Sequence, residues 1–291
     1  MDGPTLEERR ASLSTLRRLI FSSSVPWERQ RARFAAATSA TPVAHGVVRE
    51  AVTIGSLSVE TLTPPDVGDR AIVYVHGGGY CIGSPAMGRA LGSWLAVTLR
   101  ATCYGLDYRL APEHPAPAAV QDVTLLLEHL AGHEVVGLAD SAGAGALVAA
   151  LVSGAAPVGA LAMVSPWLDP LGPYDDDLAA RDPLLSIGWL ETCARAYARD
   201  LGDELVSPLH ASWAGIAPTV VVGTDDDLTA PDAAALAARE LAGVTVQTWP
   251  GLWHDFALAL GQLPEAAEAA EVIGQHLAGV MGWRRVDATG W

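Results

Sequence analysis

The stretch VVGLADSAGAGALVAALVS at residues 135–153 decides the fold class of this chain. Its first five residues, Val135–Ala139, form a short apolar run that predicts a buried strand. Residues 142–153 are rich in alanine and leucine, which favour a helix. A buried strand that turns directly into a buried helix is typical of an α/β protein with a parallel sheet.

The same alternation continues on both sides of this stretch. Further apolar runs predict strands at Ala71–Val75, Ala101–Leu106, Ala160–Val164, Thr219–Val222 and Val244–Thr248. Helices are expected between them, at about residues 85–99, 117–131, 230–242 and 264–280. Short apolar strands between helices predict a mostly parallel central sheet that helices cover on both faces.

Two parts of the chain depart from this alternation. Helical patterns at 5–20 and 26–37 precede a predicted hairpin of Val47–Ile54 and Leu57–Leu62. Residues 171–205 form an insertion with a helix-like run at Ile187–Tyr197. No repeat or linker divides the chain. We therefore expect an N-terminal helical segment at 1–45 and one domain at 46–291, which carries the insertion 171–205.

Composition limits the class of partner. Half of the 291 residues are hydrophobic and 18% are charged, as in a globular protein. The formal net charge of −15 argues against nucleic acid and anionic membrane surfaces as partners. No charge occurs from Ser141 to Leu168, but Gly154, Pro157 and Gly159 interrupt this stretch. A buried helix and strand are therefore expected there rather than a membrane span.

The cysteines and the N-terminus bear on location. Cys81, Cys103 and Cys193 are sparse and have no paired spacing, which favours reduced thiols in a cytoplasmic protein. The N-terminal residues carry charges where an export signal needs an apolar run. His129 and His133 have a spacing seen in metal sites, but no third ligand is evident, so we expect no metal.

A glycine-rich segment is the first candidate for chemistry. HGGGY at 76–80 directly follows the predicted strand Ala71–Val75. Consecutive glycines let a backbone approach a ligand closely and aim several N–H groups at one point, as an oxyanion hole requires. A plain glycine-rich turn is the alternative interpretation.

The second candidate is Ser141, which lies where the strand Val135–Ala139 meets the following helix. A serine on a sharp strand-to-helix turn exposes its hydroxyl above the sheet. The alternative is a helix N-cap, a position that serine also favours.

Asp226 and His254 complete the set. Each follows a predicted strand, at the edge where parallel sheets place their sites. Alone, Asp226 fits a solvated acidic turn and His254 a surface or packing histidine. Together, the order glycine-rich loop, Ser, Asp, His is that of an α/β-hydrolase triad. Such a triad needs a hydroxyl nucleophile, an imidazole that takes its proton and a carboxylate that orients the imidazole.

In these motifs the chain resembles the hormone-sensitive-lipase branch of the α/β-hydrolases, which includes bacterial esterases and lactone hydrolases. The matching segments are HGGGY at 76–80, DYRLAPEHPAPA at 107–118, DSAG at 140–143, SPWLD at 165–169, Asp226–Leu228 and GLWHDF at 251–256. The resemblance implies an α/β-hydrolase fold with a helical cap, made by the N-terminal helices and the 171–205 insertion. Residues 107–118 would brace the site from behind.

The resemblance also implies roles for the residues of the triad. Ser141 would be the nucleophile, His254 the general base and Asp226 the orienting acid. Asp226 is preferred among the three consecutive aspartates because the family places leucine two residues after the acid, and Leu228 fits. The family's glycine two residues before the serine is replaced here by Ala139.

The remaining site residues follow from the same resemblance. The N–H groups of Gly78, Gly79 and Ala142 would form the oxyanion hole. Tyr80, in the glycine-rich segment, and Trp253, beside the proposed base, are the candidate substrate-binding residues. No metal or organic cofactor is implied, and a homodimer is possible by family analogy.

The activity expected from these residues is hydrolysis of small to medium, fairly apolar carboxylic esters or lactones through an acyl-enzyme, with thioesters as related substrates. Two alternatives stay open. An acyltransferase or cyclase of a biosynthetic pathway would use the same triad, and a non-catalytic ligand receptor could share the fold.

Overall fold

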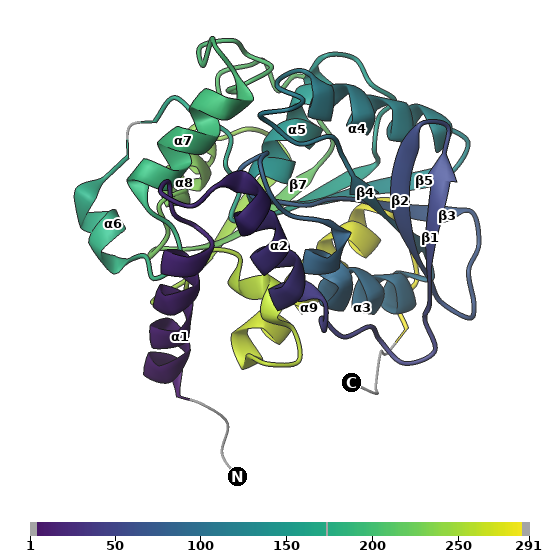
Figure 1. Cartoon of the computed structure of the whole chain (residues 1–291). Coiled ribbons are helices and arrows are strands. Elements are labelled where there is room, and N and C mark those ends of the chain that lie inside the picture. The colour runs from purple at the N-terminus through teal and green to yellow at the C-terminus, as the bar shows by residue number, and fades with distance from the viewer. Residues whose placement is uncertain (1–4, 173, 287–291) are drawn as a thin grey trace.

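An eight-stranded sheet forms the centre of the computed structural model, which describes residues 5–172 and 174–286 (Figure 1). Its order is β1-β2-β4-β3-β5-β6-β7-β8. β2 runs antiparallel to β1 and β4, and the remaining neighbours are parallel. The strands are β1 Val48–Ile54, β2 Leu57–Thr63, β3 Arg70–Val75, β4 Thr102–Asp107, β5 Glu134–Asp140, β6 Ala160–Val164, β7 Thr219–Thr224 and β8 Val244–Trp249. The mostly parallel sheet predicted from the sequence is confirmed.

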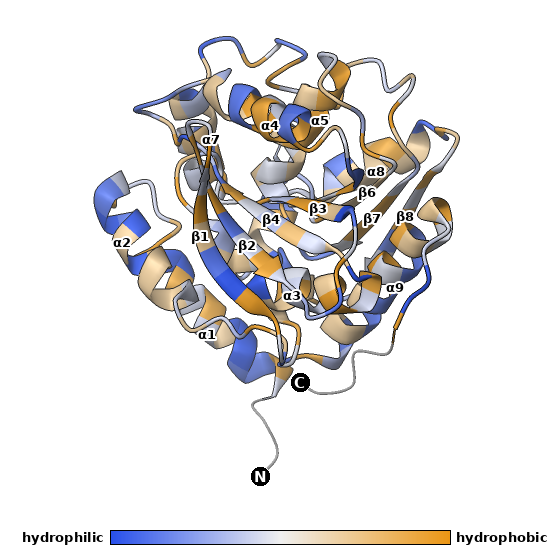
Figure 2. Ribbon diagram, turned by 90° about the vertical axis from the view of Figure 1, so that its right-hand side faces the viewer, coloured by the Kyte–Doolittle hydropathy of each residue, from blue (hydrophilic) through white to orange (hydrophobic). Residues whose placement is uncertain are grey.

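Helices cover both faces of the sheet, with α4 and α5 above it and α3 and α9 below it in Figure 2. They are α3 Arg89–Leu99, α4 Ala118–His129, α5 Ser141–Val152, α8 Ala230–Ala238 and α9 Pro264–Met281, with short 3₁₀ helices η1 Pro85–Gly88 and η2 Phe256–Ala259. The uncharged stretch from residue 141 thus folds as the helix α5 and the strand β6. No helix within the described residues is long and apolar enough to span a membrane.

Side chains of the central strands alternate between two cores. In β3, Val73 and Val75 face the core that contains α4 and α5, whereas Ile72 and Tyr74 face the core that contains α3 and α9. These four side chains are at most 2% exposed. Because both faces are covered, the strand is a continuous apolar run, as expected for a parallel sheet.

The strand register brings the candidate segments together. β3 and β5 are parallel and pair Val75 with Ala139, so the glycine-rich loop and Ser141 leave the sheet at the same edge. β7 and β8 are also parallel and pair Thr224 with Trp249. The loops that hold Asp226 and His254 therefore start from that same carboxyl edge, where such sheets place their sites.

Four helices outside the two layers gather on one side of the molecule (Figure 1). They are α1 Leu6–Leu19, α2 Trp27–Thr38, α6 Asp176–Arg181 and α7 Ile187–Tyr197, and we call them the cap helices. Phe21 packs edge-on against Phe34 of α2 and Trp189 of α7, with ring centroids 5.5 and 5.0 Å away. The Trp189 indole N–H also donates to Gln30 Oε1 of α2 at 2.8 Å. The N-terminal segment and the insertion are thus packed against each other.

Candidate active site

Ser141 lies on a sharp turn between β5 and α5. Its φ of 47° falls in the left-handed region, which is strained for a residue with a side chain. The turn is crowded, because a Cβ on Gly143 would lie 2.1 Å from the Val75 carbonyl oxygen and one on Gly77 2.9 Å from Ser141 Cβ. Glycine at these two positions lets the end of β3 pack directly on the serine turn. Ala139 is fully buried in β5, and its methyl is accommodated there.

The glycine-rich loop folds beside Ser141. Gly78 has a φ of 104° and Gly79 a φ of 61°, and the Gly78 carbonyl accepts hydrogen bonds from the N–H groups of Cys81 and Ile82. Gly78 and Ser141 line the same cavity. Ala142 lies in the first turn of α5, where backbone N–H groups have no partner within the helix. Of the predicted oxyanion-hole residues, Ala142 thus follows Ser141 in the chain, and Gly78 and Gly79 lie in the glycine-rich loop beside it.

His76 holds this loop in place. Its Nδ1 donates to the Gly77 carbonyl at 2.7 Å, and its ring stacks on Tyr108 with centroids 4.3 Å apart. The Tyr108 hydroxyl in turn donates to the His76 carbonyl at 2.9 Å. Burial lowers the pKa of His76 to about 4, so the ring is neutral at neutral pH. His76 therefore acts as a structural brace for the loop.

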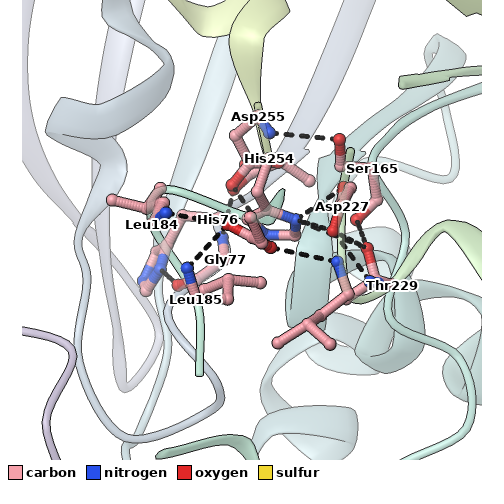
Figure 3. Close-up of polar contacts among 12 residues, drawn as sticks. His76, Gly77, Ser165, Leu184, Leu185, Asp227, Thr229, His254 and Asp255 are labelled. Carbon is pink, nitrogen blue, oxygen red and sulfur yellow. Dashed lines mark hydrogen bonds and ion pairs between the residues drawn. The ribbon is translucent and has the colours of Figure 1, made fainter. Parts of the chain in front are cut away.

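The side chain that orients His254 is Asp227, and the expectation of Asp226 is wrong in this respect. Both carboxylate oxygens of Asp227 lie 2.9 Å from His254 Nδ1 (Figure 3). Thr229 fixes the acid from behind, donating to Asp227 Oδ1 from its N–H at 2.7 Å and its hydroxyl at 3.0 Å. Asp227 is 1% exposed, as a carboxylate that orients a buried imidazole must be.

The other two aspartates of the run point elsewhere. Asp225 Oδ1 accepts a hydrogen bond from the Gly251 N–H at 2.8 Å. Asp226 forms ion pairs with Arg10 of α1, at 3.2 Å, and with Arg181 of α6, at 2.9 Å. Consecutive residues of a turn project in different directions, so the leucine spacing that favoured Asp226 could not distinguish it from its neighbour.

A second carboxyl group, that of Asp255, lies on the opposite side of the imidazole. Asp255 Oδ2 is 3.3 Å from His254 Nε2, and the Asp255 N–H donates to Ser165 Oγ at 3.1 Å. The backbone here has a φ of 60°, a conformation that aspartate tolerates better than most residues. In the sequence, Asp255 directly follows the proposed base. That position alone does not show that its side chain returns to the imidazole.

Charge around His254 is concentrated and buried. Burial alone would lower the pKa of His254, but the carboxylates of Asp227 and Asp255 outweigh it and raise this pKa to about 10. Burial raises the pKa of Asp140 to about 6, although hydrogen bonds from Tyr74 and Gly77 oppose the shift. Burial and the neighbouring carboxyls raise the pKa of Asp255 as well. The carboxylates therefore favour the protonated imidazole, the form that a triad must stabilise when it accepts the serine proton.

A cavity of about 240 Å³ opens beside Ser141 and His254. Trp253 lines it, as expected. Side chains of the cap helices and their connections supply most of its apolar wall, namely Leu13, Leu16, Phe21, Phe34, Leu184, Leu185 and Trp189. An apolar cavity with a few polar groups at one end is the usual form of a small-molecule site.

Tyr80 does not line this cavity, contrary to expectation. Its φ of 62° turns the side chain inward, where the ring stacks on Tyr197 with centroids 3.6 Å apart and is 1% exposed. The Tyr80 carbonyl accepts a hydrogen bond from the Ala111 N–H at 2.9 Å. Tyr80 therefore joins the loop to the segment behind it instead of contacting a ligand in the cavity.

Within the part of the chain that the structure describes, no group of three or more His, Cys, Asp or Glu side chains is placed to hold a metal ion.

The comparisons with known proteins agree with the geometry. Residues 72–258 match the family model of the alpha/beta hydrolase fold. The fold superposes with a TM-score of 0.87 on a hormone-sensitive lipase from a metagenome library, at 28% identity over 97% of this chain and 100% of the other. This chain belongs to the hormone-sensitive-lipase-like esterase family.

Two known hydrolases are similar in sequence. An acetyl-hydrolase of Streptomyces hygroscopicus is 36% identical over 244 residues, which cover 78% of this chain and 82% of the relative. An esterase of Acinetobacter venetianus is 32% identical over 224 residues, covering 71% and 74%. Membership of this family makes the chain an esterase-type hydrolase.

Proposed function

We propose that the chain hydrolyses small to medium, fairly apolar carboxylic esters through an acyl-enzyme, with Ser141 as nucleophile, His254 as general base and Asp227 as orienting acid. The observation that carries the proposal is the buried contact of Asp227 with His254 Nδ1, at a cavity that Ser141 and Gly78 also line. The acetyl-hydrolase and esterase relatives support a carboxylic ester as substrate.

The proposed reaction has two halves. Ser141 Oγ attacks the ester carbonyl carbon and its proton passes to His254 Nε2. The carbonyl oxygen becomes an oxyanion, which the N–H groups of Gly78, Gly79 and Ala142 stabilise. The C–O bond to the alcohol breaks as His254 returns the proton to the leaving oxygen. A water molecule then repeats the sequence on the acyl-serine and releases the acid.

The substrate class follows from the cavity. Its wall is largely apolar, so burying an apolar acyl or alcohol group there is favourable, by about 25 cal/mol per Å². Its volume of about 240 Å³ limits that group to a small or medium size. Lactones and thioesters have the same electrophilic carbonyl and fall within the proposal.

Hydrolysis of p-nitrophenyl acetate, butyrate and octanoate by wild type and Ser141→Ala tests this function. Loss of the nucleophile is expected to remove roughly 10⁴–10⁶ of the rate. Equal turnover by the folded variant would contradict the mechanism. A burst of one p-nitrophenol per chain without turnover would contradict hydrolysis, since water would then not be the acceptor, and would support acyl transfer.

A further inference from the structure

Three consecutive aspartates after β7 have three different partners. Asp225 binds the Gly251 N–H, and Asp227 binds His254. Asp226 alone points to the cap, where it pairs with Arg10 of α1 and Arg181 of α6. Its side chain is 18% exposed, so these ion pairs are partly shielded from water.

Arg10 connects that aspartate to the loop of the general base. Its Nη1 donates to the carbonyls of Gly251 and Leu252 at 2.8 and 3.0 Å, three and two residues before His254. Its Nη2 donates to the Arg181 carbonyl at 2.5 Å and lies 3.2 Å from Asp226 Oδ2. One guanidinium from α1 thus contacts the loop of the acid, the loop of the base and the end of α6.

A second contact of α1 reaches the same place. Arg17 Nη1 donates to the Asp182 carbonyl at 2.9 Å, and Asp182 Oδ2 accepts a hydrogen bond from the Leu228 N–H at 3.0 Å. Leu228 adjoins Asp227 in the chain. The Asp182 side chain also accepts from the N–H groups of Leu184 and Leu185, which line the cavity.

We propose that Arg10 and Asp226 are positioning residues that couple the cap helix α1 to the relative placement of His254 and Asp227. Charge-assisted hydrogen bonds to backbone carbonyls fix geometry more firmly than exposed ion pairs do. The inference rests on the proposed function, because it assumes that the rate of the reaction depends on the contact of Asp227 with His254. Asp226 was expected from the sequence to be the orienting acid of the triad, and here it has a role outside the triad.

The alternative is that these contacts only stabilise the fold. The test compares Arg10→Gln, Asp226→Asn, their double variant and Arg10→Lys, which keeps the charge but loses the fork of donors. Arg18→Gln is the matched control, since Arg18 is on the same helix and donates to Thr15 within it. The readouts are kcat and KM for p-nitrophenyl butyrate, the rate at which a fluorophosphonate modifies Ser141, and the thermal unfolding midpoint.

Both single charge-removing variants are expected to lower kcat by about tenfold or more with little change in KM, because small misplacements of catalytic groups are costly. The modification rate should fall in parallel. Arg10→Lys should have a higher kcat than Arg10→Gln. The kcat of the double variant should be no lower than that of the slower single variant. The kcat of Arg18→Gln should match that of wild type.

Two results would overturn the inference. The first is a kcat within about twofold of wild type in folded Arg10→Gln and Asp226→Asn, even with a lower unfolding midpoint. The second is a loss of kcat in the double variant that equals the product of the two single losses. If Arg10→Gln fails to fold, Asp226→Asn and Arg10→Lys carry the test. Failure of the proposed function is distinguished by Ser141→Ala: an active Ser141→Ala refutes the triad, whereas an inactive one with wild-type-like Arg10 and Asp226 variants refutes only this inference.

Discussion

Asp255 Oδ2 lies 3.3 Å from His254 Nε2, while Asp227 contacts the other ring nitrogen, Nδ1. In the proposed mechanism Nε2 is the atom that accepts the Ser141 proton. The imidazole therefore has a carboxyl group on each side. Asp255 Oδ1 is buried and has no hydrogen-bond partner among the described residues. A carboxyl group so placed stabilises the imidazolium and so makes the free base scarcer at a given pH.

Replacing Asp255 should change the pH profile. Only the neutral imidazole can accept the serine proton, so activity falls as pH drops through the pKa of His254. The raised pKa places this acid limb of kcat/KM above the ordinary value of 6.5 in wild type. Asp255→Asn removes one cause of the increase and should move the limb to lower pH. Rates from pH 5 to 10 check this, with exposed Asp176→Asn as the control; an unmoved limb in Asp255→Asn would refute the electrostatic role.

The choice of acid is tested by neighbouring variants. Asp227→Asn should lower kcat by roughly 10⁴, because the amide no longer holds the imidazole in the required tautomer. Asp226→Asn should cost about 10- to 100-fold, since it loosens the placement of the two loops but keeps the Asp227 carboxylate that pairs with His254. Steady-state kinetics on p-nitrophenyl butyrate measures both. A larger loss in Asp226→Asn than in Asp227→Asn would reverse the assignment.

The size of the cavity should determine chain-length preference. Phe34 contributes to the wall from α2, and Phe34→Ala enlarges the space available to a ligand. The ratio of kcat/KM for octanoate over butyrate should rise by about tenfold, within the range that one or two methylenes give. Phe34→Leu, a smaller change, should give a smaller rise. An unchanged ratio in folded Phe34→Ala would place the acyl chain elsewhere.

Packing between the cap helices depends on a buried polar contact. Gln30 is 1% exposed and accepts the Trp189 indole N–H, and its own amide donates to the carbonyls of Ser22 and Val25. Gln30→Leu leaves these groups unpaired and should lower the free energy of unfolding by about 1–3 kcal/mol. Urea unfolding measures this, with the exposed Gln121→Leu expected to change stability by less than about 0.5 kcal/mol. Equal stabilities would show that water replaces the lost partners.

The sequence predicted the sheet because its signals are local. The central strands β3, β5, β6 and β7 contain apolar, buried runs, and the glycines at 77 and 143 follow from backbones that nearly touch. The identity of the acid is not a local property. Asp225, Asp226 and Asp227 are chemically the same, and only the partners around the turn, Gly251, Arg10 and His254, distinguish them.

Tyr80 shows the same limit. The sequence places it in the glycine-rich segment, but the direction of its side chain depends on a positive φ and on Tyr197, which lies far away in the chain. Neither can be derived from the neighbouring residues. Trp253 lines the cavity, because a residue next to His254 shares its loop, and its role in substrate binding stays a prediction.

Ser141 is the proposed nucleophile, and a labelled organophosphonate ester tests this role most directly. Wild-type protein is titrated with the reagent, residual esterase activity is measured, and the modified peptide is identified by mass spectrometry. We expect one phosphonyl group per chain, on Ser141, with activity lost in proportion to labelling and no label in Ser141→Ala. Inactivation with the label on another residue, or full activity with Ser141 modified, would contradict it.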